Sequence, residues 1–155
     1  MTDDLVTTIE TGHRKVTRQA VVHAPAAELF ALVANPHRHT ELDGSGTLRA
    51  VPVTGPDRLS AGAAFTVGMK QFGVPYKITS KVTAFEDDKL IEWQHPMGHR
   101  WRWEFTETGP GTTQVTETFD YSGARSPRML EMFGYPAKNG DGIAKTLRAL
   151  TARFA

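Results

Sequence analysis

Apolar and polar residues alternate along most of the middle of the chain. Such alternation puts every second side chain on one face of a strand and is typical of a sheet with one buried face. Turn-forming residues, mainly Gly, Pro and Asp, interrupt the pattern at short intervals, which favours antiparallel hairpins. We therefore predict a meander of six strands, over residues 47–53, 63–71, 75–86, 90–95, 100–106 and 112–122.

A further strand and a short helix precede this meander. Residues 14–23 are rich in β-branched side chains and predict a strand. The following segment, residues 25–34, has helical spacing of its apolar residues and stops at Asn35-Pro36, because the residue before a proline avoids helical geometry. A second helical turn is expected near residues 37–40. Residues 1–12 have scattered apolar positions and are expected to form a tail or loose lead-in to one domain over residues 13–155.

Helical periodicity returns in the last thirty residues. Apolar residues there recur at spacings of three and four, at Met129, Leu130, Phe133, Ile143, Leu147, Leu150 and Phe154. Pro136 and the glycines of residues 139–142 predict a kink or break near residues 134–142, which would let the first half move as a lid.

An amphipathic helix and a sheet with one apolar face can bury both surfaces by packing on each other. The predicted fold is therefore a two-layer α+β domain, in which a curved antiparallel sheet of seven strands wraps around a long C-terminal helix. A chain of 155 residues is long enough for one such domain.

Composition and charge argue against several classes of function. The net charge is +1, so no global field draws the chain to nucleic acid, and no apolar run approaches the length of a membrane span. There is no cysteine, which excludes disulfides and thiolate chemistry and fits a reducing compartment. The two early acids do not resemble a secretory signal. We expect a cytoplasmic protein.

The inner face of the predicted sheet is strongly aromatic. Alternation puts Trp101, Trp103 and Phe105 on one face, with Arg100 and Arg102 on the other. The same rule, extended to the neighbouring strands and helices, predicts a wall that contacts an apolar ligand, made of Phe65, Met69, Tyr76, Trp93, Trp101, Trp103, Phe119, His39, Met129 and Phe133.

Glu117 is the anomaly on this inner face, because a buried carboxylate is costly unless it is paired, neutralised or hydrated. One interpretation makes Glu117, with His95 and Tyr121, a catalytic acid–base set or a polar anchor. The other shifts the register by one residue or pairs Glu117 with Arg102 on the solvent side. His95, directly before Pro96, also fits an ordinary turn residue. Both interpretations stay open at this stage.

Two further motifs are weaker. Every second residue from position 37 to 43 could bind a metal: His37, His39, Glu41 and Asp43. On a strand these side chains would point the same way, but the helical turn predicted here directs them apart. We therefore expect no metal, and no cofactor. His39 is instead expected to border the pocket, and Glu41 and Asp43 to cap the turn. The loop at residues 43–46 lacks the lysine of a phosphate-binding loop, and no nucleophile motif is present.

The chain resembles the SRPBCC superfamily over residues 14–155. The resemblance is carried by the element order, by residues 24–30 (APAAELF) and by Ala34-Asn35-Pro36; residues 39–46 and 146–150 look like its polyketide cyclase/dehydrase-like branch. This implies a helix-grip fold with a cavity between sheet and C-terminal helix. It does not fix a reaction, because members range from carriers to enzymes.

Three functions follow from these expectations. The first is binding of a hydrophobic, aromatic or polycyclic small molecule, with no metal and no nucleic acid involved. The second is a cyclase/dehydratase-type enzyme using Glu117, His95 and Tyr121. The third is a non-catalytic interaction module. A small hydrophobic molecule is the expected partner, and self-association as a homodimer is left open.

Overall fold

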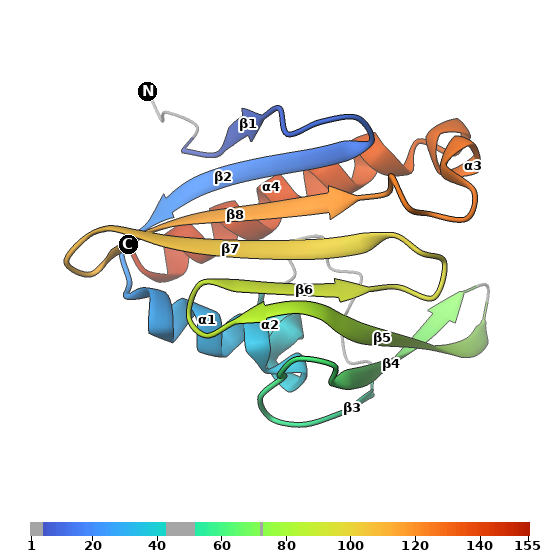
Figure 1. Ribbon diagram of the computed structural model, residues 1–155, viewed down its shortest axis with the longest axis horizontal. Helices are drawn as coiled ribbons and strands as arrows, with labels where there is room; N and C mark the ends of the chain where they lie inside the picture. The colour runs from blue at the N-terminus through green and yellow to red at the C-terminus, as the bar shows by residue number, and fades with distance from the viewer. Residues whose placement is uncertain (1–4, 43–51, 72) are drawn as a thin grey trace.

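The computed structural model describes residues 5–42, 52–71 and 73–155, and its centre is one curved antiparallel sheet (Figure 1). The strands of the described residues lie in the order β1-β2-β8-β7-β6-β5-β4-β3. Their bounds are β1 Thr7–Ile9, β2 Lys15–Val22, β3 Val53–Thr54, β4 Ala64–Gln71, β5 Val74–Glu86, β6 Leu90–Gln94, β7 Arg100–Gly109 and β8 Thr112–Asp120.

The predicted meander is present from β4 to β8, with neighbouring strands paired antiparallel. Two details differ from the expectation. The lead-in contains β1, which pairs with β2 at the edge of the sheet and makes the described strands eight rather than seven. Of the strand predicted over residues 47–53, only its end falls within the described residues, as β3.

Short helices follow β2 as predicted. They are α1 Ala26–Ala34, the 3₁₀ turn η1 Pro36–Arg38, and α2 His39–Leu42. Helix α1 buries Leu29, Phe30 and Val33 completely. The Phe30 ring meets Phe85 and Phe105 edge-to-face at centroid distances of 5.5 and 5.7 Å, which anchors α1 on the sheet.

The C-terminal helix is interrupted, as predicted, but for a different reason. Helix α3 (Pro127–Met132) is separated from α4 (Tyr135–Arg153) by Gly134, whose φ of +74° ends the first helix. Pro136 causes no break, because it lies in the first turn of α4, where a missing N–H costs no hydrogen bond. The segment at residues 139–142 continues the helix.

Gly140 has a packing role within that segment. A Cβ atom there would lie 2.7 Å from Nη2 of Arg18 and 3.0 Å from Cγ1 of Val16, so the glycine lets α4 approach β2 closely. Helix α4 lies against β2 and β8 on the inner face (Figure 1) and buries Ile143, Leu147 and Leu150 there. This is the α+β helix-grip arrangement that the resemblance implied. None of the helices in the described ranges is long and apolar enough to cross a membrane.

Candidate functional site

Side chains on the inner face of β6, β7 and β8 form three rows across the sheet, because the strands are paired in register. The first row is Ile91, Trp103 and Glu117, and the second is Trp93, Trp101 and Phe119. The third row follows at the strand ends and is His95, His99 and Tyr121; the His95 N–H donates to the His99 carbonyl at 2.8 Å. The predicted face is therefore confirmed for β6, β7 and β8.

The three tryptophans of this face differ in burial. Trp103, in the first row, is 3% exposed and belongs to the core. Trp93 and Trp101, in the second row, are only half-buried, although they stand on the same face. The Trp101 ring lies 5.0 Å from the Phe119 ring. The second row therefore keeps aromatic surface that the core does not cover.

His39 closes one side of the second row. Its ring stacks on Trp93 at 5.1 Å and meets Phe65 edge-to-face at 5.5 Å. Nε2 lies 2.7 Å from the Val33 carbonyl, which can only accept, so the ring donates from Nε2. Burial lowers the pKa of His39 to about 4, so the ring is neutral at pH 7.

His99 is a member of the third row that the sequence reasoning missed. Its ring stacks on His95 at 4.2 Å and meets Phe119 edge-to-face at 5.3 Å. Burial, and then the charge on His95, lower the pKa of His99 to about 4. Nδ1 of His99 is buried and accepts or donates no hydrogen bond among the residues that the structure describes. Its position opposite His95 across a predicted tight turn was the available signal.

The candidate catalytic side chains do not form one cluster. His95 Nδ1 accepts the Met97 N–H at 3.0 Å, so that nitrogen holds the turn. Tyr121 donates its hydroxyl to Oε2 of Glu131 on α3 at 2.9 Å. Burial, and then the Glu131 carboxylate, raise the pKa of Tyr121. The Tyr121 hydroxyl thus links β8 to α3.

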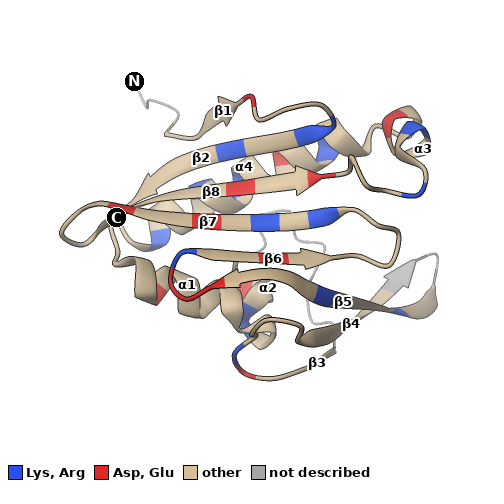
Figure 2. Cartoon of the chain, viewed as in Figure 1, with Lys and Arg blue, Asp and Glu red and all other residues tan. Residues whose placement is uncertain are grey.

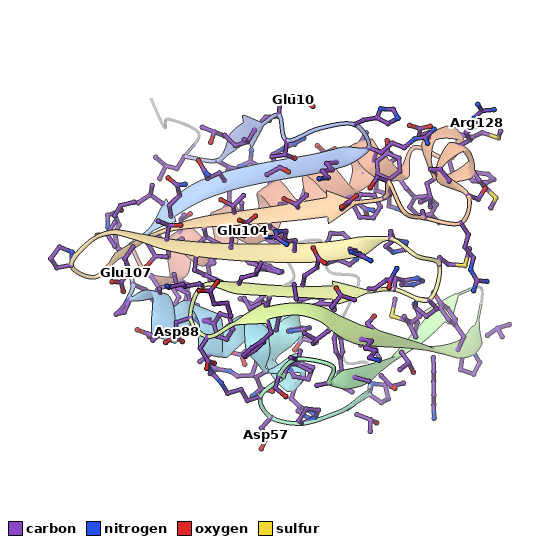
Figure 3. All side chains as sticks on the ribbon, viewed as in Figure 1. Glu10, Asp57, Asp88, Glu104, Glu107 and Arg128 are labelled. Atoms are coloured by element: carbon purple, nitrogen blue, oxygen red, sulfur yellow. The ribbon has the colours of Figure 1, made fainter. Side chains whose placement is uncertain are left out.

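Glu117 lies on the inner face, 7% exposed, opposite Trp103 on β7 and Arg18 on β2. Arg102 does not pair with it. That guanidinium contacts Glu92 at 3.2 Å and Glu104 at 3.1 Å on the other face of the sheet, where Glu104 is visible in Figure 3. Glu117 on β8 and Tyr121, directly after the end of β8, are four residues apart, roughly 13 Å in an extended chain, with Phe119 between them.

The remaining residues of the predicted ligand wall are placed unevenly. Phe65 is buried and Met69 is half-buried on β4, whereas Tyr76 is exposed near the tip of the β4–β5 hairpin. Met129 on α3 and Phe133, directly after α3, are exposed, and Leu130 is the side chain of α3 that packs against the core. Met129 and Phe133 were expected to wall the pocket from the first half of an interrupted helix, but in that half it is Leu130 that packs against the core.

The alternating histidines and acids at residues 37–43 do not converge. Nε2 of His37 lies 2.8 Å from the Gly55 carbonyl, and His39 points into the core. Glu41 pairs with Arg38 at 2.8 Å and with Arg153 at 3.1 Å, which lowers its pKa to about 2. Asp43 and the loop at residues 43–46 lie outside the described residues. In the described residues, the side chains of His37, His39 and Glu41 therefore point to different partners, as the predicted helical turn implied.

Among residues 5–42, 52–71 and 73–155, two hollows that open at the surface stand out. One, of about 300 Å³, lies between β1, β2 and α4 and is lined by Val6, Thr8, Arg18, Asp141, Ala144, Lys145 and Arg148. The other, of about 460 Å³, lies at the β6–β7 turn and is lined by Thr79, Lys81, Gln94, His95, Pro96, Gly98, Gly123 and Arg125. Neither hollow is lined by Trp93 or Trp101. The evidence for an interior ligand is therefore the part of these two tryptophans that the core leaves exposed.

Comparison with known proteins gives the family. Residues 13–155 match the family described as polyketide cyclase / dehydrase and lipid transport. The chain belongs to this family. It is also similar to the uncharacterised protein Rv0088 of Mycobacterium tuberculosis, with 49% identity over 154 residues, which is 97% of this chain and 68% of that protein.

Solved structures share the family fold. A Rhodobacter sphaeroides protein superposes with a TM-score of 0.70 at 13% identity, over 96% of each chain. Protein Ms6760 of Mycobacterium smegmatis gives a TM-score of 0.64 at 19% identity, over 94% of this chain and 96% of its own. At these sequence identities the similarity shows a shared fold and says nothing about a shared ligand. The family description supports binding of hydrophobic molecules at a coarse level.

Proposed function

We propose that this protein binds a flat hydrophobic molecule, aromatic or polycyclic, against the second row of the inner face. The observation that carries the proposal is the half-buried state of Trp93 and Trp101 beside the fully buried Trp103. A tryptophan on a concave face next to the core would normally be covered. Each further 100 Å² of apolar surface that a ligand covers contributes roughly 2.5 kcal/mol.

The side walls of the proposed site suit an aromatic ligand. His39 stacks on one side of Trp93 with its neutral ring, and Phe119 lies against Trp101. Rings of this kind favour offset-stacked and edge-to-face partners. The ligand would therefore lie among rings rather than among aliphatic side chains, which favours a planar molecule over a simple acyl chain.

His99 supplies the polar contact of the proposed site. Its Nδ1 is buried, and the ring is neutral at pH 7 because its pKa is lowered to about 4. A buried polar atom that gains a hydrogen bond on binding orients the ligand, since leaving it without one costs about 1–3 kcal/mol. We propose that a hydroxyl of the ligand bonds to this nitrogen.

Native mass spectrometry of the protein purified from its own host tests the proposal. A co-purified molecule with fused or conjugated rings, retained by the wild type and lost from Trp101→Ala, is the expected result. Leu5→Ala, an exposed apolar residue far from the second row, serves as the control and should retain the molecule. A protein that arrives empty and binds nothing from a library of aromatic compounds contradicts the proposal.

The cyclase/dehydratase alternative needs Glu117, His95 and Tyr121 to act on one substrate. The hydrogen bonds of Tyr121 and of His95 Nδ1, and the Phe119 ring between Glu117 and Tyr121, favour binding over such a reaction. Glu117→Gln separates the two functions. It should leave ligand affinity within about threefold, and a ligand that is chemically converted by the wild type but not by Glu117→Gln would establish the enzyme instead.

Cytoplasmic location is part of the same proposal. Its support is the absence of cysteine from the sequence, which fits a reducing compartment. Fractionation of host cells, followed by detection of the protein in the cytosolic and extracellular fractions, tests it.

A further inference from the structure

Large apolar side chains are exposed together at one end of the molecule, around α3. Met132 is 80% exposed and Phe133 is 67% exposed. The other members of this group, which we name the α3 corner, are Met97, Met129 and Tyr135. Met97 belongs to the β6–β7 turn and is held there because its carbonyl accepts the Arg125 N–H at 2.9 Å. Figure 1 shows α3 projecting beyond the ends of β2 and β8.

The exposed apolar side chains of the α3 corner are not required to hold the fold together. Leu130 is the residue of α3 that packs against the core, and the Tyr121–Glu131 hydrogen bond already ties α3 to β8. Polar residues at positions 132 and 133 would serve the helix equally well. A contiguous exposed apolar group of this kind marks a surface that meets another apolar phase.

The charges around the α3 corner are mainly positive. Arg125, Arg128 and Lys138 are exposed there; Arg128 is the one basic residue of α3 and is labelled in Figure 3, and Figure 2 shows the charged segments of this end of the molecule. The acid of α3, Glu131, is turned back to the Tyr121 hydroxyl and lies 3.5 Å from Arg14. Its charge is therefore largely balanced from within the molecule.

The hollow of about 460 Å³ adjoins this corner. Arg125 lines it, together with Lys81 and Gln94, and its lining contains no carboxylate. Within the described residues neither Arg125 nor Lys81 forms an ion pair, so both present donors to whatever enters the hollow. A group with several negative oxygens fits such a lining.

We propose that the α3 corner docks on an anionic lipid surface. Met132 and Phe133 enter the boundary between headgroups and acyl chains, while Arg125 and Arg128 stay at the level of the phosphates. Apolar side chains flanked by arginines bind lipid interfaces in this way, and each cation contributes through the negative surface potential. A protein partner is less well matched, because the corner offers five exposed large apolar side chains, whereas a stable protein interface takes about 20–30 residues from each partner.

Cosedimentation with vesicles tests the docking. The wild type should bind vesicles of phosphatidylcholine with 30% phosphatidylglycerol, and bind pure phosphatidylcholine at least tenfold more weakly. Met132→Ser with Phe133→Ser should weaken binding to the anionic vesicles about tenfold. Arg125→Gln and Arg128→Gln should weaken it about fivefold each and reduce its dependence on salt.

Matched controls keep the test specific. Leu5→Ser removes an equally exposed apolar residue elsewhere, and Lys145→Gln removes an exposed cation from α4; neither should change vesicle binding by more than about twofold. Trp101→Ala should bind vesicles normally, because the docking does not require the interior ligand. Equal binding to both vesicle types, or a dimer that forms through Met132 and Phe133 without any vesicle binding, overturns the proposal.

Discussion

At the scale of single residues, two tryptophans on one strand differ in burial and therefore in their expected contribution to stability. Trp101 and Trp103 share the inner face of β7, but the first is half-buried and the second is in the core. Trp103→Ala should therefore lower the free energy of unfolding by about 3–5 kcal/mol, and Trp101→Ala by clearly less, about 1–2 kcal/mol. Urea denaturation of both variants measures this difference. Equal losses of stability would mean that Trp101 is core and presents no surface to a ligand.

His39 makes the stability depend on pH in a predictable direction. Its pKa is about 4 in the folded protein and near 6.5 in the unfolded chain, so the unfolded state binds more protons between these values. The stability due to neutral His39 is thus present above pH 6.5 and is lost as the pH falls toward 4. Between pH 7 and pH 5 the loss from this residue is roughly 2 kcal/mol.

His39→Gln isolates this effect, because glutamine does not titrate and can still donate to the Val33 carbonyl. The free energy of unfolding of the variant, measured in urea at pH 7 and pH 5, should fall by roughly 2 kcal/mol less than that of the wild type. His99 titrates in the same window and remains in both proteins. Identical pH dependence in the two proteins would show that His39 is not a buried neutral base.

At the scale of elements, the contact between α4 and β2 depends on Gly140. Alanine normally stabilises a helix by about 1 kcal/mol relative to glycine. Here its Cβ would lie 3.0 Å from Cγ1 of Val16, a short β-branched side chain that cannot swing away as the end of Arg18 can, so Gly140→Ala should instead destabilise the protein by about 1 kcal/mol. Lys145→Ala, on the exposed side of the same helix, is the control and should stay within about 0.5 kcal/mol. Thermal unfolding monitored by circular dichroism compares them; a stabilised Gly140→Ala would refute the close contact.

The elements themselves were largely predictable, because periodicity is a local property of the chain. Alternation in residues 100–106 correctly predicted the inner face of β7, and Asn35-Pro36 correctly predicted the end of α1. The side of α3 was not predictable. Met129, Leu130 and Phe133 fit one helical stripe, and only the structure shows that Leu130 packs against the core while Met129 and Phe133 are exposed.

The candidate site was less predictable than the fold, because it depends on which inner-face residues the helices leave uncovered. Sequence alternation cannot separate Trp101 from Trp103. Nor does it show that His99, placed before the predicted strand, extends the third row next to His95. Alternation left two positions open for Glu117, on the inner face or on the solvent side; the strand register, which also gives its neighbours Trp103 and Arg18, decides for the inner face.

At the scale of the whole molecule, a ligand bound to the folded state alone must stabilise it. At a free ligand concentration one hundred times the dissociation constant, the gain is about 2.7 kcal/mol. Protein stripped of small molecules by organic extraction and refolding should therefore melt at a lower temperature than protein as purified, and adding the extract back should restore the difference. The same treatment should leave the melting temperature of Trp101→Ala unchanged. Equal melting of stripped and untreated wild type would speak against a resident ligand.

The central claim is that Trp93 and Trp101, but not Trp103, contact the ligand, and the indole N–H signals of the protein report on it directly. The chain has three tryptophans, so a ¹⁵N-labelled sample gives three such signals, assigned with single Trp→Phe variants. Titration with 1-anilinonaphthalene-8-sulfonate, a planar aromatic probe, should shift the signals of Trp93 and Trp101 and leave that of Trp103 nearly unchanged. No shift at Trp93 and Trp101 while the probe binds elsewhere would contradict the account.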